Sequence, residues 1–249
     1  MNTWKYCCIL FLLISCSEKP AEQVNRPSEE PSEDLYSLAK RHAEARLGIG
    51  PTENYELKIY KKDMDGDALE DAIITVNRLE FAMNEAAKST NPAKQAEIGF
   101  MGNYNYIFYY DAVLDKISPE IVVPSSPNAA LKVTFEQISS DRYFDPIVEY
   151  RILNAAYKDF YAIVEHTPQH VFQWKVFEGL NKSQKEAYSF KYDKGTISPR
   201  KDILVYKATL KDPGKVEDIY HYNPIILPSD DLLYRFFYYP AEGKYLTQK

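Results

Sequence analysis

The chain has 249 residues, of which 45% are hydrophobic, so it can bury the core of one fair-sized domain or two small ones. Its formal net charge of −6 argues against nucleic acid as a partner, because binding phosphate groups needs concentrated Lys and Arg. Aromatic residues make up 14% and include 21 Tyr, against only 9 Gly. That bias favours β-strands, since flat amphipathic rings suit a half-buried sheet surface.

The chain opens with a charged residue and a short apolar run. Lys5 precedes the run at residues 6–14, which is too short to span a bilayer as a helix but suits a signal peptide. The run ends in Leu13-Ile14-Ser15-Cys16. These residues resemble the lipobox of bacterial lipoproteins, in which an aliphatic, a variable and a small residue precede the cysteine. A simple secretory signal or a short membrane anchor is the alternative.

The lipobox resemblance implies a diacylglycerol group on the Cys16 sulfur, cleavage before this residue, and usually a further acyl chain such as palmitate. Two or three acyl chains hold a protein firmly at a membrane, whereas one holds it only marginally. The resemblance therefore implies a lipid-anchored protein of the cell envelope. Ser17 favours the outer membrane, because an Asp at that position often retains lipoproteins in the inner membrane.

Three regions follow from this interpretation: a signal peptide over residues 1–15, a lipidated cysteine with a tether over 16–33, and one globular domain over 34–249. Residues 17–34 are acidic, contain Pro and carry little apolar mass, which predicts a disordered tether. All three cysteines lie before residue 17, so the domain has no thiol and no disulfide. Its stability must come from packing, with or without a metal ion.

Two helices are predicted. Apolar residues recur at helical spacing over residues 34–48, where Asp34 or Ser32 can cap the start and Gly48 ends the helix. His42 falls on or beside the apolar stripe and is expected to pack in the core rather than to bind a ligand. A second helix is predicted over residues 79–89, at the start of a polar insertion that extends toward Asn103.

From residue 55 onward the signals are mostly those of strands. The predicted strands cover residues 55–62, 72–77, 104–110, 131–138, 147–153, 160–166, 171–177, 187–192, 203–208 and 234–240. In the strand at 147–153, alternation places Val148, Tyr150 and Ile152 inward and Glu149 and Arg151 outward. The predicted fold class is mainly β (α+β): an antiparallel sheet or sandwich with one N-terminal helix and a second helix near 79–89.

Aromatic residues alternate along the strand predicted at 104–110. Tyr104, Tyr106, Phe108 and Tyr110 share one face of that strand. Such a stripe can stack on the apolar faces of sugars or on a peptide, or it can pack into the core. The core-facing interpretation is favoured.

The segment between the first two predicted strands is the most informative of the chain. It reads Asp63-Met64-Asp65-Gly66-Asp67-Ala68-Leu69-Glu70-Asp71, with aspartates at loop positions 1, 3, 5 and 9. Calcium takes about six to eight oxygen ligands, and carboxylates at this spacing can converge on one ion. Aspartates this close repel one another unless a cation neutralises them.

This loop resembles the calcium loops of FG-GAP and VCBS repeats, where Asp-x-Asp/Asn-Gly-Asp-Gly-x-x-Asp leads into a strand. The resemblance implies a structural calcium site. Its implied ligands are the side chains of Asp63, Asp65, Asp67 and Asp71 and the carbonyl of Leu69. The loop departs from the family at Ala68, where the family has Gly and where a left-handed turn costs a residue with a Cβ about 1 kcal/mol or more. A solvated, metal-free hairpin turn is the alternative.

Other motifs carry weaker signals. His166 and His170 have a spacing seen in zinc sites, but they lie in a predicted turn around Pro168, and the domain offers no cysteine. No nucleophile elbow, Walker loop or dinucleotide-binding loop occurs in the sequence. We therefore expect an envelope-anchored binding or structural module, with a protein or glycan partner, rather than an enzyme. The alternative is a hydrolase whose active site assembles only in the fold.

Overall fold

The computed structural model describes residues 34–211 and 214–247 of the chain. The lipobox and the predicted tether lie outside these residues. Residues 34–249 group into one compact unit. Within the described ranges, no helix is both long and apolar enough to cross a lipid bilayer.

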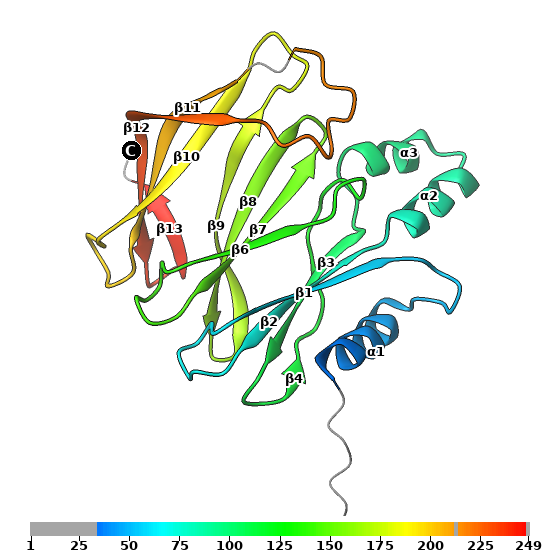
Figure 1. Cartoon of the computed structure of the whole chain (residues 1–249), viewed down its shortest axis with the longest axis horizontal. Coiled ribbons are helices and arrows are strands. Elements are labelled where there is room, and N and C mark those ends of the chain that lie inside the picture. The colour runs from blue at the N-terminus through cyan, green and yellow to red at the C-terminus, as the bar shows by residue number, and fades with distance from the viewer. Residues whose placement is uncertain (1–33, 212–213, 248–249) are drawn as a thin grey trace, which may run out of the picture. The chain divides into compact units, whose positions relative to one another are not determined.

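The first of two antiparallel sheets has the strand order β1-β2-β3-β4, with β5 paired to β3 (Figure 1). Its strands are β1 (Glu56–Lys62), β2 (Asp71–Asn77), β3 (Asn105–Asp111), β4 (Lys116–Ile117) and β5 (Ile121–Val122). β2 is buried along its whole length, which accounts for its nearly continuous apolar run. The register of β1 with β2 places the acidic loop at the hairpin between them.

The second sheet follows the chain, in the order β13-β12-β11-β10-β9-β8-β7-β6. Its strands are β6 (Lys132–Glu136), β7 (Asp145–Ile152), β8 (Ala155–Val164), β9 (Thr167–Glu178), β10 (Glu186–Asp193), β11 (Asp202–Leu210), β12 (Ile226–Tyr239) and β13 (Lys244–Thr247). β9 and β10 are registered only at Glu186 with Glu178 and at Ala187 with Phe177, and they diverge beyond these pairs. The two sheets confirm the predicted mainly-β, antiparallel class.

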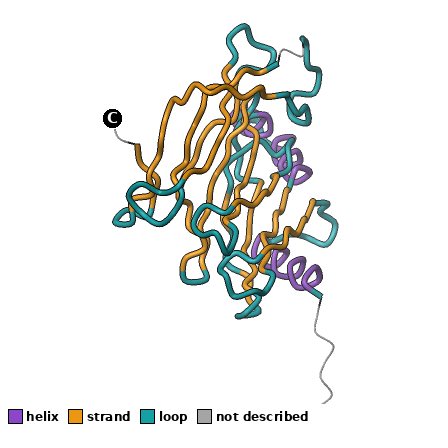
Figure 2. Tube along the Cα trace, turned by 60° about the vertical axis from the view of Figure 1, so that its left-hand side comes forward, coloured by secondary structure: helices purple, strands orange, loops and turns teal. Residues whose placement is uncertain are grey.

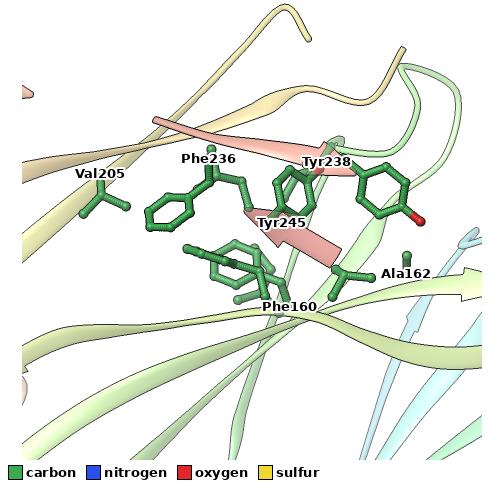
Figure 3. Packing of buried hydrophobic residues seen from close by; sticks show 11 residues of the cluster. Phe160, Ala162, Val205, Phe236, Tyr238 and Tyr245 are labelled. Atoms are coloured by element: carbon green, nitrogen blue, oxygen red, sulfur yellow. The ribbon is translucent and has the colours of Figure 1, made fainter. Parts of the chain in front are cut away.

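The eight-stranded sheet curls so that its two halves pack against each other. One cluster of buried side chains combines Phe160 of β8 with Val205 of β11, Phe236 of β12 and Tyr245 of β13 (Figure 3). The ring centroids of Phe172 and Phe236 lie 4.7 Å apart, in a tilted arrangement that aromatic pairs favour. These contacts hold β8 and β9 to β11–β13 across the divergence between β9 and β10.

A second cluster lies between the two sheets. Ile73 and Ile107 of the five-stranded sheet pack with Val148, Tyr150 and Tyr161 of the eight-stranded sheet. Val148 and Tyr150 therefore face inward, as their alternation predicts. Because each sheet contributes apolar side chains to one shared core, the sheets pack face to face.

The helices of the described residues lie on the side of the five-stranded sheet (Figure 2). α1 (Leu35–Leu47) begins after the N-cap Asp34, whose side chain accepts a hydrogen bond from the Ser37 amide, and ends at Gly48 in the left-handed conformation. α2 (Leu79–Lys88) is the second predicted helix. α3 (Pro92–Gly99) was not predicted and lies in the polar insertion.

The aromatic stripe of β3 packs beneath the helices. Phe108 is 1% exposed, and Tyr106 and Tyr110 pack around it against α1. Tyr104 is also buried. His42 of α1 packs edge-on against Phe108, with ring centroids 5.5 Å apart. The stripe and His42 thus belong to the core, as favoured by the sequence.

One inward–outward assignment is wrong. Arg151 of β7 was expected to face solvent, yet it is 4% exposed. Tyr150 faces the shared core between the sheets, while Arg151 lies on the other face over the Phe177 ring and under the carbonyl of Tyr222. Alternation assumes that one face of a strand meets water, and a curled sheet covers both faces of β7.

Candidate functional site

The acidic loop folds into successive tight turns between β1 and β2. The Asp63 carboxylate accepts a hydrogen bond from the Gly66 amide at 2.8 Å, and that of Asp65 accepts one from the Asp67 amide at 3.2 Å. Asp67 in turn accepts from the Leu69 amide at 2.7 Å. These turns bring ligand oxygens of Asp63, Asp65 and Asp67 within 4.8 Å of one another. The local spacing of the sequence is therefore enough to gather three carboxylates.

Ala68 has φ 70°, which is the left-handed conformation expected where the FG-GAP and VCBS loops have glycine. Gly66 also has a positive φ, 88°, which a glycine adopts without steric cost. A Cβ at residue 66 would in addition lie 3.0 Å from the Tyr143 ring. The loop therefore keeps the backbone of a tight turn even though its second glycine is replaced by alanine.

Asp71, the fourth implied ligand, has a different environment. It is fully buried, and its two carboxylate oxygens accept hydrogen bonds from the Met64 amide at 3.2 Å and from the Ala112 amide at 3.0 Å. Asp71 thereby ties the acidic loop to the turn that follows β3. Burial raises its pKa to about 6, although the two backbone hydrogen bonds oppose the rise. Leu69, whose carbonyl is the fifth implied ligand, has a side chain that is 48% exposed.

The fold adds two residues that the sequence analysis did not connect to this loop. Asp111 ends β3, one residue beyond the pairing of Ala72 with Tyr110, and therefore lies beside Asp71. His166 lies in the turn between β8 and β9 with φ 61°. Its Nδ1 is 2.5 Å from Asp111 Oδ2 and 4.0 Å from Asp65 Oδ2. The site therefore joins one sheet to the other.

Negative charge is concentrated at this junction. Burial raises the pKa of Asp65, and the neighbouring carboxylates of Asp67, Asp111 and Asp63 raise it further. The Tyr109 hydroxyl is buried beside Asp71. Burial raises its pKa, and so do the nearby charges of Asp71, Asp111 and Asp65. A cation would relieve this repulsion.

Two overlapping groups of atoms can hold that cation. Asp63, Asp65 and Asp67 offer carboxylate oxygens alone, which suits a hard ion such as calcium. Asp65 also belongs to a second group with Asp111 and His166. His170 is elsewhere: its Nε2 lies 3.4 Å from Asp159, and its ring packs on Tyr161. The structure thus separates the two histidines of the zinc-like spacing.

Comparison of the chain with protein-family models, with curated proteins and with solved structures gave no significant match.

Proposed function

We propose that this protein is a lipid-anchored lipoprotein of the cell envelope whose domain is a binding or structural module held together by a calcium ion. The observation that carries the calcium part is the convergence of Asp63, Asp65 and Asp67 within 4.8 Å beside the junction of the two sheets. The anchor part rests on the sequence Leu13-Ile14-Ser15-Cys16. The outer membrane is the proposed location because Ser17 follows the cysteine.

A structural role for calcium is supported by the position of the loop. Asp65 lies within reach of His166 from the other sheet, and Asp71 fixes the loop to the turn after β3. An ion at Asp63, Asp65 and Asp67 would cancel repulsion at a point where three turns meet. Calcium would therefore stabilise the packing of the sheets rather than activate a water molecule.

A binding role is supported by an open hollow on the eight-stranded sheet. Its volume is about 470 Å³, and its lining includes aromatic rings from four strands: Tyr157, Trp174, Tyr188 and Tyr234. Tyr234 is 44% exposed, and its ring centroid lies 5.3 Å from that of Trp174. Flat rings stack on sugar faces and on peptides, so a glycan or a protein is the proposed partner.

Calorimetric titration of the full chain in detergent micelles tests the calcium site, after removal of metal with EDTA. We expect heat on calcium addition and a rise in melting temperature. At a hundredfold excess over the dissociation constant, the gain in stability is about 2.7 kcal/mol. Asp65→Asn should abolish most of the response because Asp65 belongs to both ligand groups.

Asp230→Asn is the matched control, since Asp230 is a fully exposed aspartate on β12 whose contact is an ion pair with Lys191. It should bind calcium as the unmodified chain does. No heat from calcium, together with an unchanged melting temperature, would exclude the site and leave the loop as a metal-free turn.

A further inference from the structure

A second pocket lies where the edge strands of the two sheets approach each other. Its volume is about 310 Å³. Lys58 of β1, Lys132 of β6 and Arg151 of β7 contribute to its wall, together with Tyr220, His221 and Asn223 from the segment after β11. The pocket contains none of the aspartates of the acidic loop, although β1 leads into that loop.

Arg151 is the unusual feature of this pocket. Its Nη2 donates a hydrogen bond to the Tyr222 carbonyl at 2.7 Å, and its guanidinium lies 4.5 Å from the centre of the Phe177 ring. Its Nη1 is buried and has no hydrogen-bond partner among the described residues. An arginine stays charged in proteins, and although the charge of Glu149 acts on this one, the two side chains form no ion pair. Such a charge is costly to bury unless an anion pairs with it.

The other charges of the pocket do not supply that anion. Glu56 is paired with Lys58 at 2.6 Å, and Glu149 lies 3.9 Å from Lys158. Lys132 donates a hydrogen bond to the Asn223 side chain, which is neutral. Arg151 and Lys132 are thus two cations on the pocket wall that form no ion pair with a carboxylate among the described residues, although Glu149 lies opposite Lys132 in the register of β6 with β7. An external anion would give both cations such an ion pair.

We propose that this pocket binds a carboxylate group, with Arg151 as its main partner and Lys132 as a second. The planar guanidinium matches the two oxygens of a carboxylate. Glu56 and Glu149 also line the pocket and would repel a second negative charge, which favours a monoanionic carboxylate over a dianionic phosphate. The inference goes beyond the binding role proposed above, which concerns a different hollow, and it depends on neither the lipid anchor nor the calcium loop.

Ligand-observed NMR tests the proposal with acetate as the probe. Saturation transfer to the acetate methyl group is measured with the full chain in detergent micelles, at pH 7 and at an ionic strength held constant with chloride; empty micelles give the background. We expect a signal that saturates with acetate concentration. Inorganic phosphate should displace acetate less well than a second small carboxylate does. A signal that does not saturate, or phosphate competing better, would overturn the proposal.

Variants assign the signal to the pocket. Arg151→Gln should weaken acetate binding by about tenfold or more, and Lys132→Gln by about threefold, because each removes one cationic partner. Arg142→Gln, at an exposed arginine in the loop before β7, is the control and should bind as the unmodified chain does. Circular dichroism checks the fold of each variant. If Arg151→Gln fails to fold, Lys132→Gln decides, and unchanged binding by it would count against the pocket.

Two probes distinguish the source of the carboxylate. Acetyl-dialanine carries a free peptide C-terminus, and its amide carries none. Tighter binding of acetyl-dialanine than of acetate would assign the pocket to peptide C-termini, whereas equal or weaker binding would assign it to small acids. Binding of the amide as strongly as the acid would overturn the proposal. None of these outcomes alters the reading of the calcium titration, so the two proposals fail separately.

Discussion

At Ala68 the acidic loop takes a left-handed turn through a residue that carries a Cβ. The φ of 70° places that Cβ close to the following carbonyl, a conformation that glycine adopts without this cost. Ala68 is exposed, so burial of its methyl group does not offset the strain. The strain is thus a local property of one backbone position and can be removed there.

We therefore expect Ala68→Gly to raise the free energy of unfolding by about 0.5–1 kcal/mol, measured by denaturant titration in EDTA. Ala96→Gly is the control, because Ala96 is exposed in α3 with ordinary helical geometry. There the same change should lower stability by about 0.5–1 kcal/mol. A loss of stability at both positions would contradict the assigned strain.

Asp71 makes stability depend on pH. Its folded-state pKa of about 6 lies above its usual value of 3.8, so the protonated form is favoured by folding. The resulting stabilisation is complete below pH 3.8 and is lost as pH rises through about 6. In EDTA, lowering the pH from 7 to 4 should raise the free energy of unfolding. The contribution of Asp71 to that rise is at most about 3 kcal/mol.

Asp71→Asn imitates the neutral carboxyl group. It should remove the Asp71 contribution to the pH dependence of the unfolding free energy, measured by denaturant titration between pH 4 and pH 7. Asp230→Asn, at an exposed position, should keep it. If the Asp71→Asn variant retained the full slope between pH 4 and pH 7, another group would have to account for it.

At the scale of elements, a buried ion pair fastens the segment after α1 to the start of α2. Arg78 donates to both carboxylate oxygens of Glu53, at 2.6 and 2.7 Å, and to the Leu47 carbonyl at 3.0 Å. The Arg78 and Glu53 side chains are only 7% and 13% exposed. Arg78 also lies over the Phe81 ring. Its position at the entry to α2 makes it the link between two helices.

Glu53→Ala should destabilise the domain by about 3 kcal/mol, because it leaves the Arg78 charge buried without a partner. Glu120→Ala is the comparison: it breaks the Arg46–Glu120 pair, whose side chains are 47% and 29% exposed. That change should cost at most about 1 kcal/mol. If thermal unfolding showed equal losses of stability in the two variants, the Arg78–Glu53 pair would not be shielded from water.

Elements whose signals are local were predicted from the sequence. α1 was predicted because its caps and its apolar stripe lie within the same segment, and the first two strands were predicted because they flank the acidic loop. β4 and β13 are only 2 and 4 residues long, too short to show a period. Arg151 was misassigned because the curl of the sheet depends on contacts distant in sequence.

The same division holds for the candidate site. Asp63, Asp65 and Asp67 converge through turns within nine residues, so spacing alone indicates them. Asp111 reaches the loop through the register of β3 with β2, and His166 reaches it through the packing of one sheet on the other. Neither relation leaves a periodic trace in the sequence. The local half of the site was therefore predictable, and the cross-sheet half required the fold.

At the scale of the whole molecule, the proposed anchor decides where the domain works. Cys16→Ser removes the sulfur that would carry the lipid and should shift the protein from the membrane fraction to the soluble fraction on cell fractionation. Ser17→Ala is the control, since it keeps the cysteine, and should stay with the membranes. Persistent membrane association of Cys16→Ser would contradict lipidation as the means of attachment.

The divergence of β9 and β10 divides the eight-stranded sheet into two parts that share side-chain contacts but few backbone hydrogen bonds. Ladder hydrogen bonds resist separation along most of the sheet, whereas here contact is made by side chains, such as the tilted rings of Phe160 on β8 and Phe190 on β10, whose centroids lie 6.0 Å apart. In mild denaturant we expect the domain to open first between β9 and β10. Amide hydrogens of β10 should then exchange with deuterium before those of β8, which is paired on both sides.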